Sequence, residues 1–175
     1  MNLVDLFHSF ALGSKRLRLL MTPIGLAVFT GILLLLIYAG LFVDRAFGFP
    51  ALLPGLAGQL VGWPLLSGGL VLWAWCTVWF RRAHGTPVPF NPPRELVTGG
   101  PYAWSRNPML TGVFAFLFGL GVLLQSLSLV FMWTPVFIVL NVIELKLLEE
   151  PEMERRFGTS YLDYKRSVPM FVPKV

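Results

Sequence analysis

The chain has 175 residues, of which 55% are hydrophobic and 13% charged, and its formal net charge is +5. A water-soluble domain of this size could not cover so much apolar surface, so the composition excludes a soluble globular protein and favours one solvated by a bilayer. The single cysteine, Cys76, excludes an intrachain disulfide and a cysteine metal cluster, and we expect it to pack as an apolar residue.

Residues 1–20 mix leucine and phenylalanine with basic side chains, a pattern typical of an amphipathic helix on a membrane surface. Apolar runs follow, each close to the ~20 residues that a spanning helix needs. They cover residues 22–43, 56–80, 108–125 and 127–148. Because helices satisfy their own backbone polar groups in lipid, we expect an all-α integral membrane protein with about four transmembrane helices, in a single domain over residues 1–175.

The distribution of basic residues predicts the orientation of these helices. With four spans and both termini on one side, nearly every lysine and arginine falls on the cytoplasmic side, as the positive-inside rule requires, and only Arg45 falls in a loop of the other side. We therefore predict a multi-pass protein with cytoplasmic N- and C-termini, whose basic residues contact the headgroups of membrane lipids. These residues form no separate basic domain, which argues against nucleic-acid binding.

The segment between the second and third spans should be a cytoplasmic loop. Five prolines between residues 87 and 101 prevent a single helix there. Residues 125–128 leave room only for a tight turn, so the third and fourth spans should form an antiparallel hairpin. The open ends of this hairpin, at Arg106 and Glu149, then return to the same membrane face.

A short cytoplasmic helix is expected after the fourth span. Its apolar stripe has helical spacing and consists of Met153, Phe157, Tyr161 and Tyr164. Pro169 and Pro173 should end it. This helix would place a second group of charged and aromatic residues near the loop.

Two polar motifs flank the predicted hairpin. The first reads PFNPPRELVTGGPY at residues 89–102, continues as SRNP at residues 105–108 and ends at Gly112. The second begins with Glu149-Glu150 and runs to Val168-Pro169. In this order, and separated by one hairpin, the motifs resemble those of the isoprenylcysteine carboxyl methyltransferase family, whose wider group includes membrane phospholipid N-methyltransferases. The resemblance covers residues 85–173, approximately.

The resemblance implies S-adenosylmethionine-dependent methyl transfer at the cytoplasmic membrane face, to a lipid-like or small apolar acceptor that carries a thiol, an amine or a carboxylate. The cofactor-binding candidates are Gly100, Pro101, Tyr102, Arg106, Asn107, Pro108, Gly112, Glu149, Glu150 and Tyr161. The catalytic candidates are Glu150, Arg156 and Arg106. The chain departs from the family pattern at Asn107, where a histidine is frequent, and at Leu110, where a tyrosine is frequent.

The chemistry of the residues is consistent with this cofactor. Carboxylates such as Glu149 and Glu150 suit its amino group and hydroxyls, arginine suits its carboxylate, and aromatic rings suit its adenine. The two histidines, His8 and His84, are isolated, so no metal site is expected. A simpler interpretation of Glu149-Glu150 is a solvated helix end with local ion pairs.

Two other classes of function fit part of the pattern. A non-catalytic membrane subunit or small transporter would tolerate Glu149→Gln and Arg106→Ala, and would favour charged residues deep inside the spans. An NADPH-dependent enzyme similar to the sterol reductases would share the core, but would be expected to have a longer chain with more spans.

Overall fold

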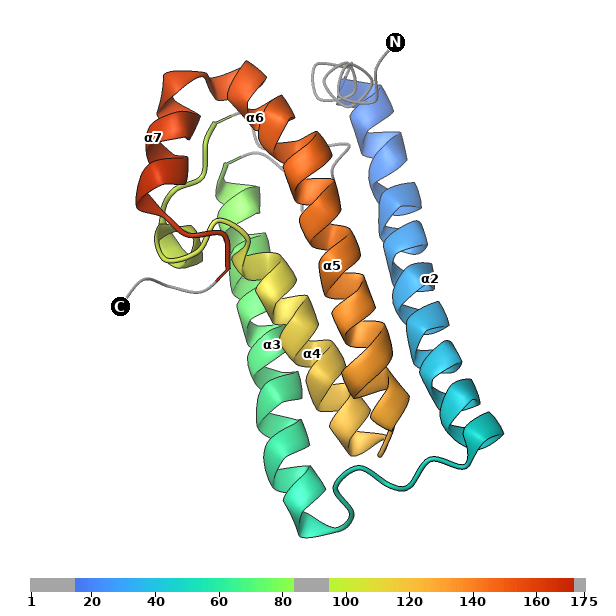
Figure 1. The fold of residues 1–175 in the computed structure, drawn as a ribbon. Helices are drawn as coiled ribbons and strands as arrows, with labels where there is room; N and C mark the ends of the chain where they lie inside the picture. Colours follow the sequence, from blue (N-terminus) through green and yellow to red (C-terminus); the bar gives the residue numbers. More distant parts are fainter. Residues whose placement is uncertain (1–14, 84–94, 172–175) are drawn as a thin grey trace. The chain divides into compact units, whose positions relative to one another are not determined.

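The computed structural model describes residues 15–83 and 95–171, with side chains from residue 21 onward. All regular elements in these ranges are helical, which confirms the all-α fold (Figure 1). The elements are α2 (Lys15–Phe47), α3 (Leu56–Arg82), η1 (Gly100–Ala103), α4 (Pro108–Leu123), η2 (Leu129–Trp133), α5 (Thr134–Glu144), η3 (Leu145–Glu149), α6 (Glu150–Phe157) and α7 (Thr159–Ser167). η1 is a 3-10 helix, and η2 and η3 are π-helical.

Three of the predicted spans correspond to helices that qualify as spans by length and composition, and the predicted count of four is not confirmed. Met21–Phe47, Leu56–Arg82 and Leu129–Phe157 are long and apolar enough to cross a membrane. The 16-residue α4 is apolar but shorter, at about 24 Å for a rise of 1.5 Å per residue. Most of the predicted surface helix lies outside the described residues, and its last part, residues 15–20, is the beginning of α2.

The residues group into two compact units, each built from separate segments of the chain. One unit contains Met1–Phe29, Ala74–Pro108 and Val142–Val175, and the other contains Thr30–Trp73 and Met109–Asn141. We call them the first and the second unit. The described residues of both motifs lie in the first unit, except for Gly112.

In the second unit, α4 and α5 form the predicted antiparallel hairpin. The turn between them has Gln125 in the left-handed region, at a φ of 58°, and the amide of Ser126 donates to the Gly121 carbonyl at 2.9 Å. Along the hairpin, the rings of Phe114 and Phe137 meet edge to face at 6.0 Å between centroids. The hairpin prediction is therefore confirmed.

Small residues allow α3 to approach α4 closely in the second unit. A Cβ atom added to Gly69 would lie 2.4 Å from the Gly112 carbonyl oxygen, and one added to Gly119 would lie 2.4 Å from the Leu66 nitrogen. Glycine is needed at these positions because the two backbones touch, as is common where helices pack in lipid.

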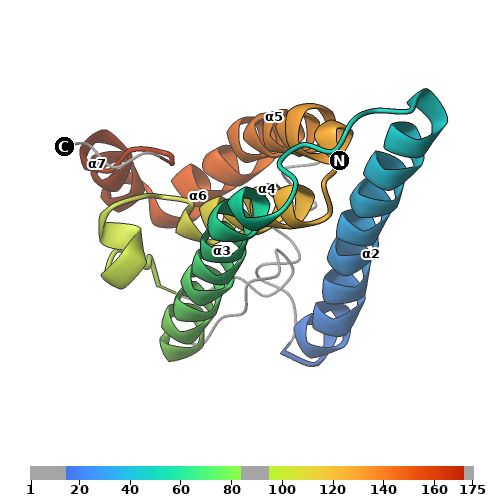
Figure 2. The same ribbon diagram turned by 90° about the horizontal axis from the view of Figure 1, so that it is seen from below.

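The same unit contains a polar network at the end of α2. The Asp44 carboxylate accepts hydrogen bonds from the Ser126 hydroxyl and, at 2.9 Å, from the Ser128 amide. The Ser128 hydroxyl donates to the Gly40 carbonyl at 2.7 Å. An extended connection then leads from α2 to α3 (Figure 2). These bonds attach α2 to the start of the helix that follows the hairpin turn.

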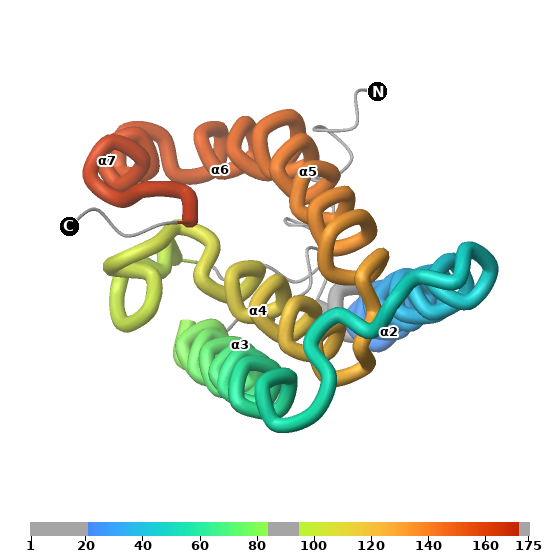
Figure 3. Tube along the Cα trace, turned by 60° about the horizontal axis from the view of Figure 1, so that its bottom comes forward, coloured from blue at the N-terminus to red at the C-terminus, as the bar shows by residue number. Residues whose placement is uncertain are grey.

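The C-terminal part of the first unit differs from the prediction of one helix. Gly158 divides it into α6 and α7 and adopts a φ of 57° and a ψ of −131°, a conformation that residues with a Cβ rarely adopt. α7 ends at Ser167, and Val168 is extended, as expected before Pro169. The chain then turns back alongside the segment that precedes α4 (Figure 3).

Candidate functional site

The first motif is shaped by a tryptophan of α3. A Cβ atom added to Gly99 or Gly100 would lie 2.6 Å or 2.3 Å from the Trp79 indole ring. Gly100 also has a φ of 60°, so its conformation and its surroundings both require glycine. Gly100, a predicted cofactor contact, therefore has a demonstrable packing role in the first unit.

The next residues of the motif are buried. Pro101 is the second residue of η1, and Tyr102, which is 5% exposed, meets the Phe80 ring edge to face at 5.3 Å. The Tyr102 hydroxyl makes no hydrogen bond to nitrogen or oxygen within the described residues. Burial raises the pKa of this phenol, so it stays protonated. The first unit thus contains a buried hydroxyl donor close to the two motifs.

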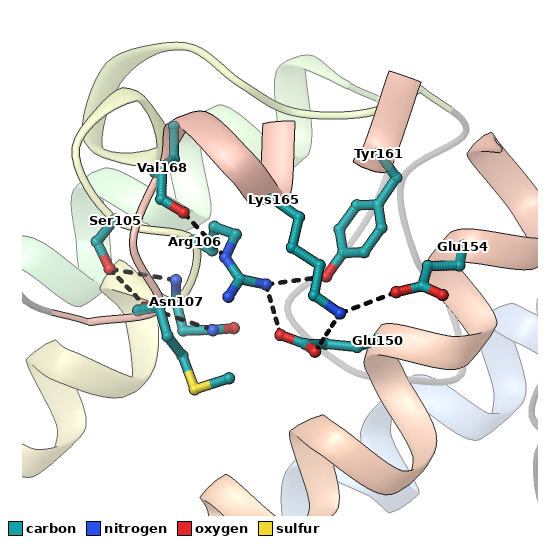
Figure 4. A network of polar contacts seen from close by, with 9 residues as sticks. Ser105, Arg106, Asn107, Glu150, Glu154, Tyr161, Lys165 and Val168 are labelled. Carbon is teal, nitrogen blue, oxygen red and sulfur yellow. Dashed lines mark hydrogen bonds and ion pairs between the residues drawn. The ribbon is translucent and has the colours of Figure 1, made fainter. Parts of the chain in front are cut away.

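The centre of the first unit is an ion pair between the two motifs. Arg106 Nη1 lies 2.5 Å from Glu150 Oε1, and each side chain is only 11% exposed (Figure 4). Arg106 also donates through Nη1 to the Tyr161 hydroxyl at 3.3 Å and through Nε to the Val168 carbonyl at 3.1 Å. Its Nη2 has no hydrogen bond to the residues that the structure describes. The predicted meeting of the two motifs is therefore observed.

The second oxygen of Glu150 is occupied as well. Lys165 Nζ lies 2.7 Å from Glu150 Oε2 and 2.8 Å from Glu154 Oε1, so one ammonium group joins two carboxylates of α6. Since both oxygens of Glu150 are paired with cations, this carboxylate is engaged in holding Arg106 and Lys165. Sequence reasoning missed Lys165, because only the bend at Gly158 brings α7 back to α6.

The neighbouring carboxylate has a different environment. Glu149 is exposed, and it forms no ion pair or hydrogen bond with the described residues. Glu149 is therefore the open carboxylate of the pair of glutamates, although it is adjacent to the enclosed Glu150.

Arg156 belongs to a separate group of contacts on α6. Its Nε lies 3.3 Å from Glu152 Oε1, its guanidinium lies over the Phe157 ring at 4.5 Å, and its Nη2 lies 3.0 Å from the Met153 sulfur. Of the three predicted catalytic residues, the structure brings Arg106 and Glu150 together, and it places Arg156 against Glu152.

The remaining predicted residues of the first motif lie at the start of α4. The Asn107 amide donates to the Met170 carbonyl at 3.1 Å, and the Asn107 side chain donates to the same oxygen at 3.4 Å. Pro108 is the first residue of α4, where a missing amide proton is not needed. Gly112 packs against Gly69 in the second unit. It is therefore not part of the polar cluster of the first unit, by which we mean Arg106, Glu150, Tyr161 and Lys165.

The charges of the cluster are fixed by its own contacts. Burial acts to lower the pKa of Arg106, but the hydrogen bond and charge of Glu150 outweigh it, so the pKa is raised. The hydrogen bonds to Glu150 and Glu154 raise the pKa of Lys165. Burial, and then the charge of Glu150, raise the pKa of Tyr161. Near neutral pH the cluster thus contains two cations and a neutral phenol.

Comparison with known proteins gave one family. The family model for phospholipid methyltransferases matches residues 59–160, which is more than half of the chain. The match contains Arg106, Asn107 and Pro108 as well as Glu149 and Glu150, and it ends within α7, before Tyr161. Neither the comparison with curated proteins nor the comparison with solved structures gave a match.

Proposed function

The chain belongs to the phospholipid methyltransferase family, and on this premise we propose that it is an integral membrane enzyme that transfers a methyl group from S-adenosylmethionine to a lipid-like or small apolar acceptor. The observation that carries this proposal is the ion pair between Arg106 and Glu150, which joins the two motifs in one polar cluster. The apolar helices α2 and α3 supply the contact with the bilayer from which a lipid-like acceptor would come.

The side chains available in the first unit fit the chemical groups of this cofactor. The open carboxylate of Glu149 can accept hydrogen bonds from an ammonium group or from ribose hydroxyls. Arg106 Nη2 has no acceptor among the described residues, so this donor can serve a carboxylate. The exposed ring of Trp104 offers an aromatic surface for adenine.

The roles of the two glutamates differ in this proposal. Glu150 already holds Arg106 and Lys165, so it acts by positioning Arg106. Glu149 is the carboxylate that contacts the ligand, and it can take the proton of an amine or thiol acceptor. Arg156, held by Glu152, supplies positive charge near Glu149 and can orient a carboxylate acceptor.

The cofactor supplies a methyl group that its sulfonium makes electrophilic. The protein therefore needs no nucleophilic side chain, and its residues act by binding, alignment and exclusion of water. Alignment of two bound reactants is worth effective molarities of about 10⁵ M or more. A cluster with side chains as enclosed as Arg106 and Glu150 also strengthens electrostatic contacts with bound groups.

The proposal is tested by methyl transfer in vesicles. Purified protein, reconstituted in phosphatidylcholine, is incubated with S-adenosylmethionine labelled on its methyl group and with acceptors of similar chain length that carry an amine, a thiol or a carboxylate. Label in one lipid-extractable product supports the proposal and identifies the acceptor group. Absence of label in every product, with folded protein, contradicts it.

A further inference from the structure

The C-terminal residues form a strap over the first motif. We use strap for residues 168–170, which run alongside residues 105–107. The Arg106 amide donates to the Pro169 carbonyl at 2.9 Å, and the Asn107 amide donates to the Met170 carbonyl at 3.1 Å. The Ser105 hydroxyl donates to the same Met170 oxygen at 3.0 Å. The backbone on which the Arg106 side chain is mounted is thus covered by the end of the chain.

The helix before the strap is fixed at one side by a buried contact. The Tyr164 hydroxyl donates to the Tyr102 carbonyl at 2.7 Å, and both rings are less than 9% exposed. This contact anchors α7 to the first motif independently of charge.

α7 is also attached to α6, by the ammonium group of Lys165. Its two ion pairs join α7 to Glu150 and Glu154, and the side chains of Lys165 and Glu154 are 34% and 39% exposed. The inner pair of Arg106 and Glu150 is far more enclosed, at 11% for each side chain. Lys165 is therefore the solvent-accessible end of a charge network whose inner end is buried.

We propose that Lys165 is a positioning residue: it keeps the Glu150 carboxylate turned toward Arg106, and it helps to hold α7 and the strap in place against the first motif. We call this role the latch. By this role, Lys165 limits the exchange of a ligand bound at Arg106. The part about ligand exchange rests on the proposed function. When Lys165 releases Glu150 and Glu154, α7 and the strap are still held to the first motif by the Tyr164 hydroxyl, by the bonds of Arg106 to Tyr161 and Val168, and by the strap's bonds to residues 105–107. Ion pairs of partly exposed side chains such as Lys165 and Glu154 are weak, so the release of Lys165, which frees α7 from α6, is accessible at equilibrium.

The first test needs no ligand. Hydrogen exchange is measured by mass spectrometry on the full chain in nanodiscs, on a peptide that contains the Arg106 and Asn107 amides. Lys165→Gln should speed exchange in this peptide about two- to fivefold, the factor expected from loss of an exposed ion pair. Lys165→Arg keeps the charge and should restore slow exchange. Arg166→Gln removes a neighbouring cation that is 79% exposed and pairs only with Asp163 among the described residues, so it should have no effect.

Unchanged exchange in Lys165→Gln would overturn the latch, and so would an equal increase in Arg166→Gln. The second test measures dissociation of S-adenosylhomocysteine after dilution. Faster dissociation from Lys165→Gln, with rescue by Lys165→Arg, supports the latch, and an unchanged rate overturns its role in exchange. If the unaltered protein binds no S-adenosylhomocysteine, the proposed function fails, while the hydrogen-exchange result still decides whether Lys165 closes the strap.

Discussion

Arg106 and Glu150 lie 44 positions apart in the chain, yet their side chains form an ion pair of 2.5 Å in which each is only 11% exposed. The hairpin of α4 and α5 separates them in sequence. A charge enclosed to this degree is costly without its partner. The pair therefore stabilises the first unit and is also part of the proposed site.

Removal of Glu150 should destabilise the protein more than removal of Arg106. Glu150→Gln should lower the free energy of unfolding by about 3 kcal/mol or more, because it leaves the enclosed Arg106 without its carboxylate. Arg106→Gln should lower it by less, because Lys165 still pairs with Glu150. The double variant should lose much less than the sum of the two changes. Unfolding in detergent micelles measures these values, and additive losses would contradict a coupled pair.

Glu149→Gln should separate binding from stability. Its carboxylate has no partner among the described residues, so the thermal midpoint should stay close to that of the unaltered protein. Affinity for S-adenosylhomocysteine should fall at least about tenfold, the effect of losing one charge-assisted hydrogen bond. The matched control is Asp163→Asn, an exposed carboxylate that is 74% accessible. Equal affinities of the two variants would remove Glu149 from the site.

The packing of α3 can be tested with two adjacent glycines. Gly69→Ala places a methyl group 2.4 Å from the Gly112 carbonyl oxygen, whereas Gly68→Ala meets nothing within 4 Å. Gly69→Ala should therefore destabilise the protein by about 1–3 kcal/mol, a cost typical of overpacking. Gly68→Ala should be close to neutral. Similar melting temperatures for the two variants would show that α3 and α4 do not touch at this point.

Asp44 should be important for holding α2. Asp44→Ala leaves the Ser128 amide without its acceptor, and we expect a loss of about 1–3 kcal/mol, as for other enclosed donors. Only 6% of the apolar window of α2 is buried, so few other contacts compensate. Arg45→Ala, one residue on, alters an exposed side chain and serves as the control. Thermal unfolding measures these losses, and equal unfolding midpoints for Asp44→Ala and Arg45→Ala would contradict the role of Asp44 in holding α2.

The contribution of Lys165 to stability should have a defined pH range. Its pKa is raised above the usual 10.5 by Glu150 and Glu154, so its stabilisation is complete below that value and is lost as the pH rises through the higher pKa of the folded state. The stability difference between the unaltered protein and Lys165→Gln should thus be constant from about pH 7 to 9.5 and shrink above about pH 10.5. A decline that begins near neutral pH would contradict this assignment.

Much of the fold follows from the sequence, because apolar runs of about 20 residues mark the long helices. Residues 125–128 were too few for anything but a turn, and the hairpin then brought Arg106 to Glu150. The break at Gly158 was not predicted, since the apolar stripe continues across it. Lys165 was missed for the same reason.

The sequence also could not show that Glu149 and Glu150 have different surroundings. Adjacent residues of a helix point about 100° apart, so one glutamate can face a cation pair while the next faces outward. Sequence reasoning grouped Glu149 with Glu150, and the structure places Glu150 between Arg106 and Lys165 and leaves Glu149 exposed.

The central claim is a site for S-adenosylmethionine formed by the first unit. It is tested most directly by calorimetric titration of the protein in nanodiscs with S-adenosylhomocysteine, with NADPH in a parallel titration. The account predicts saturable binding of S-adenosylhomocysteine and no binding of NADPH. Well-folded protein that binds only NADPH, or neither compound, would contradict it.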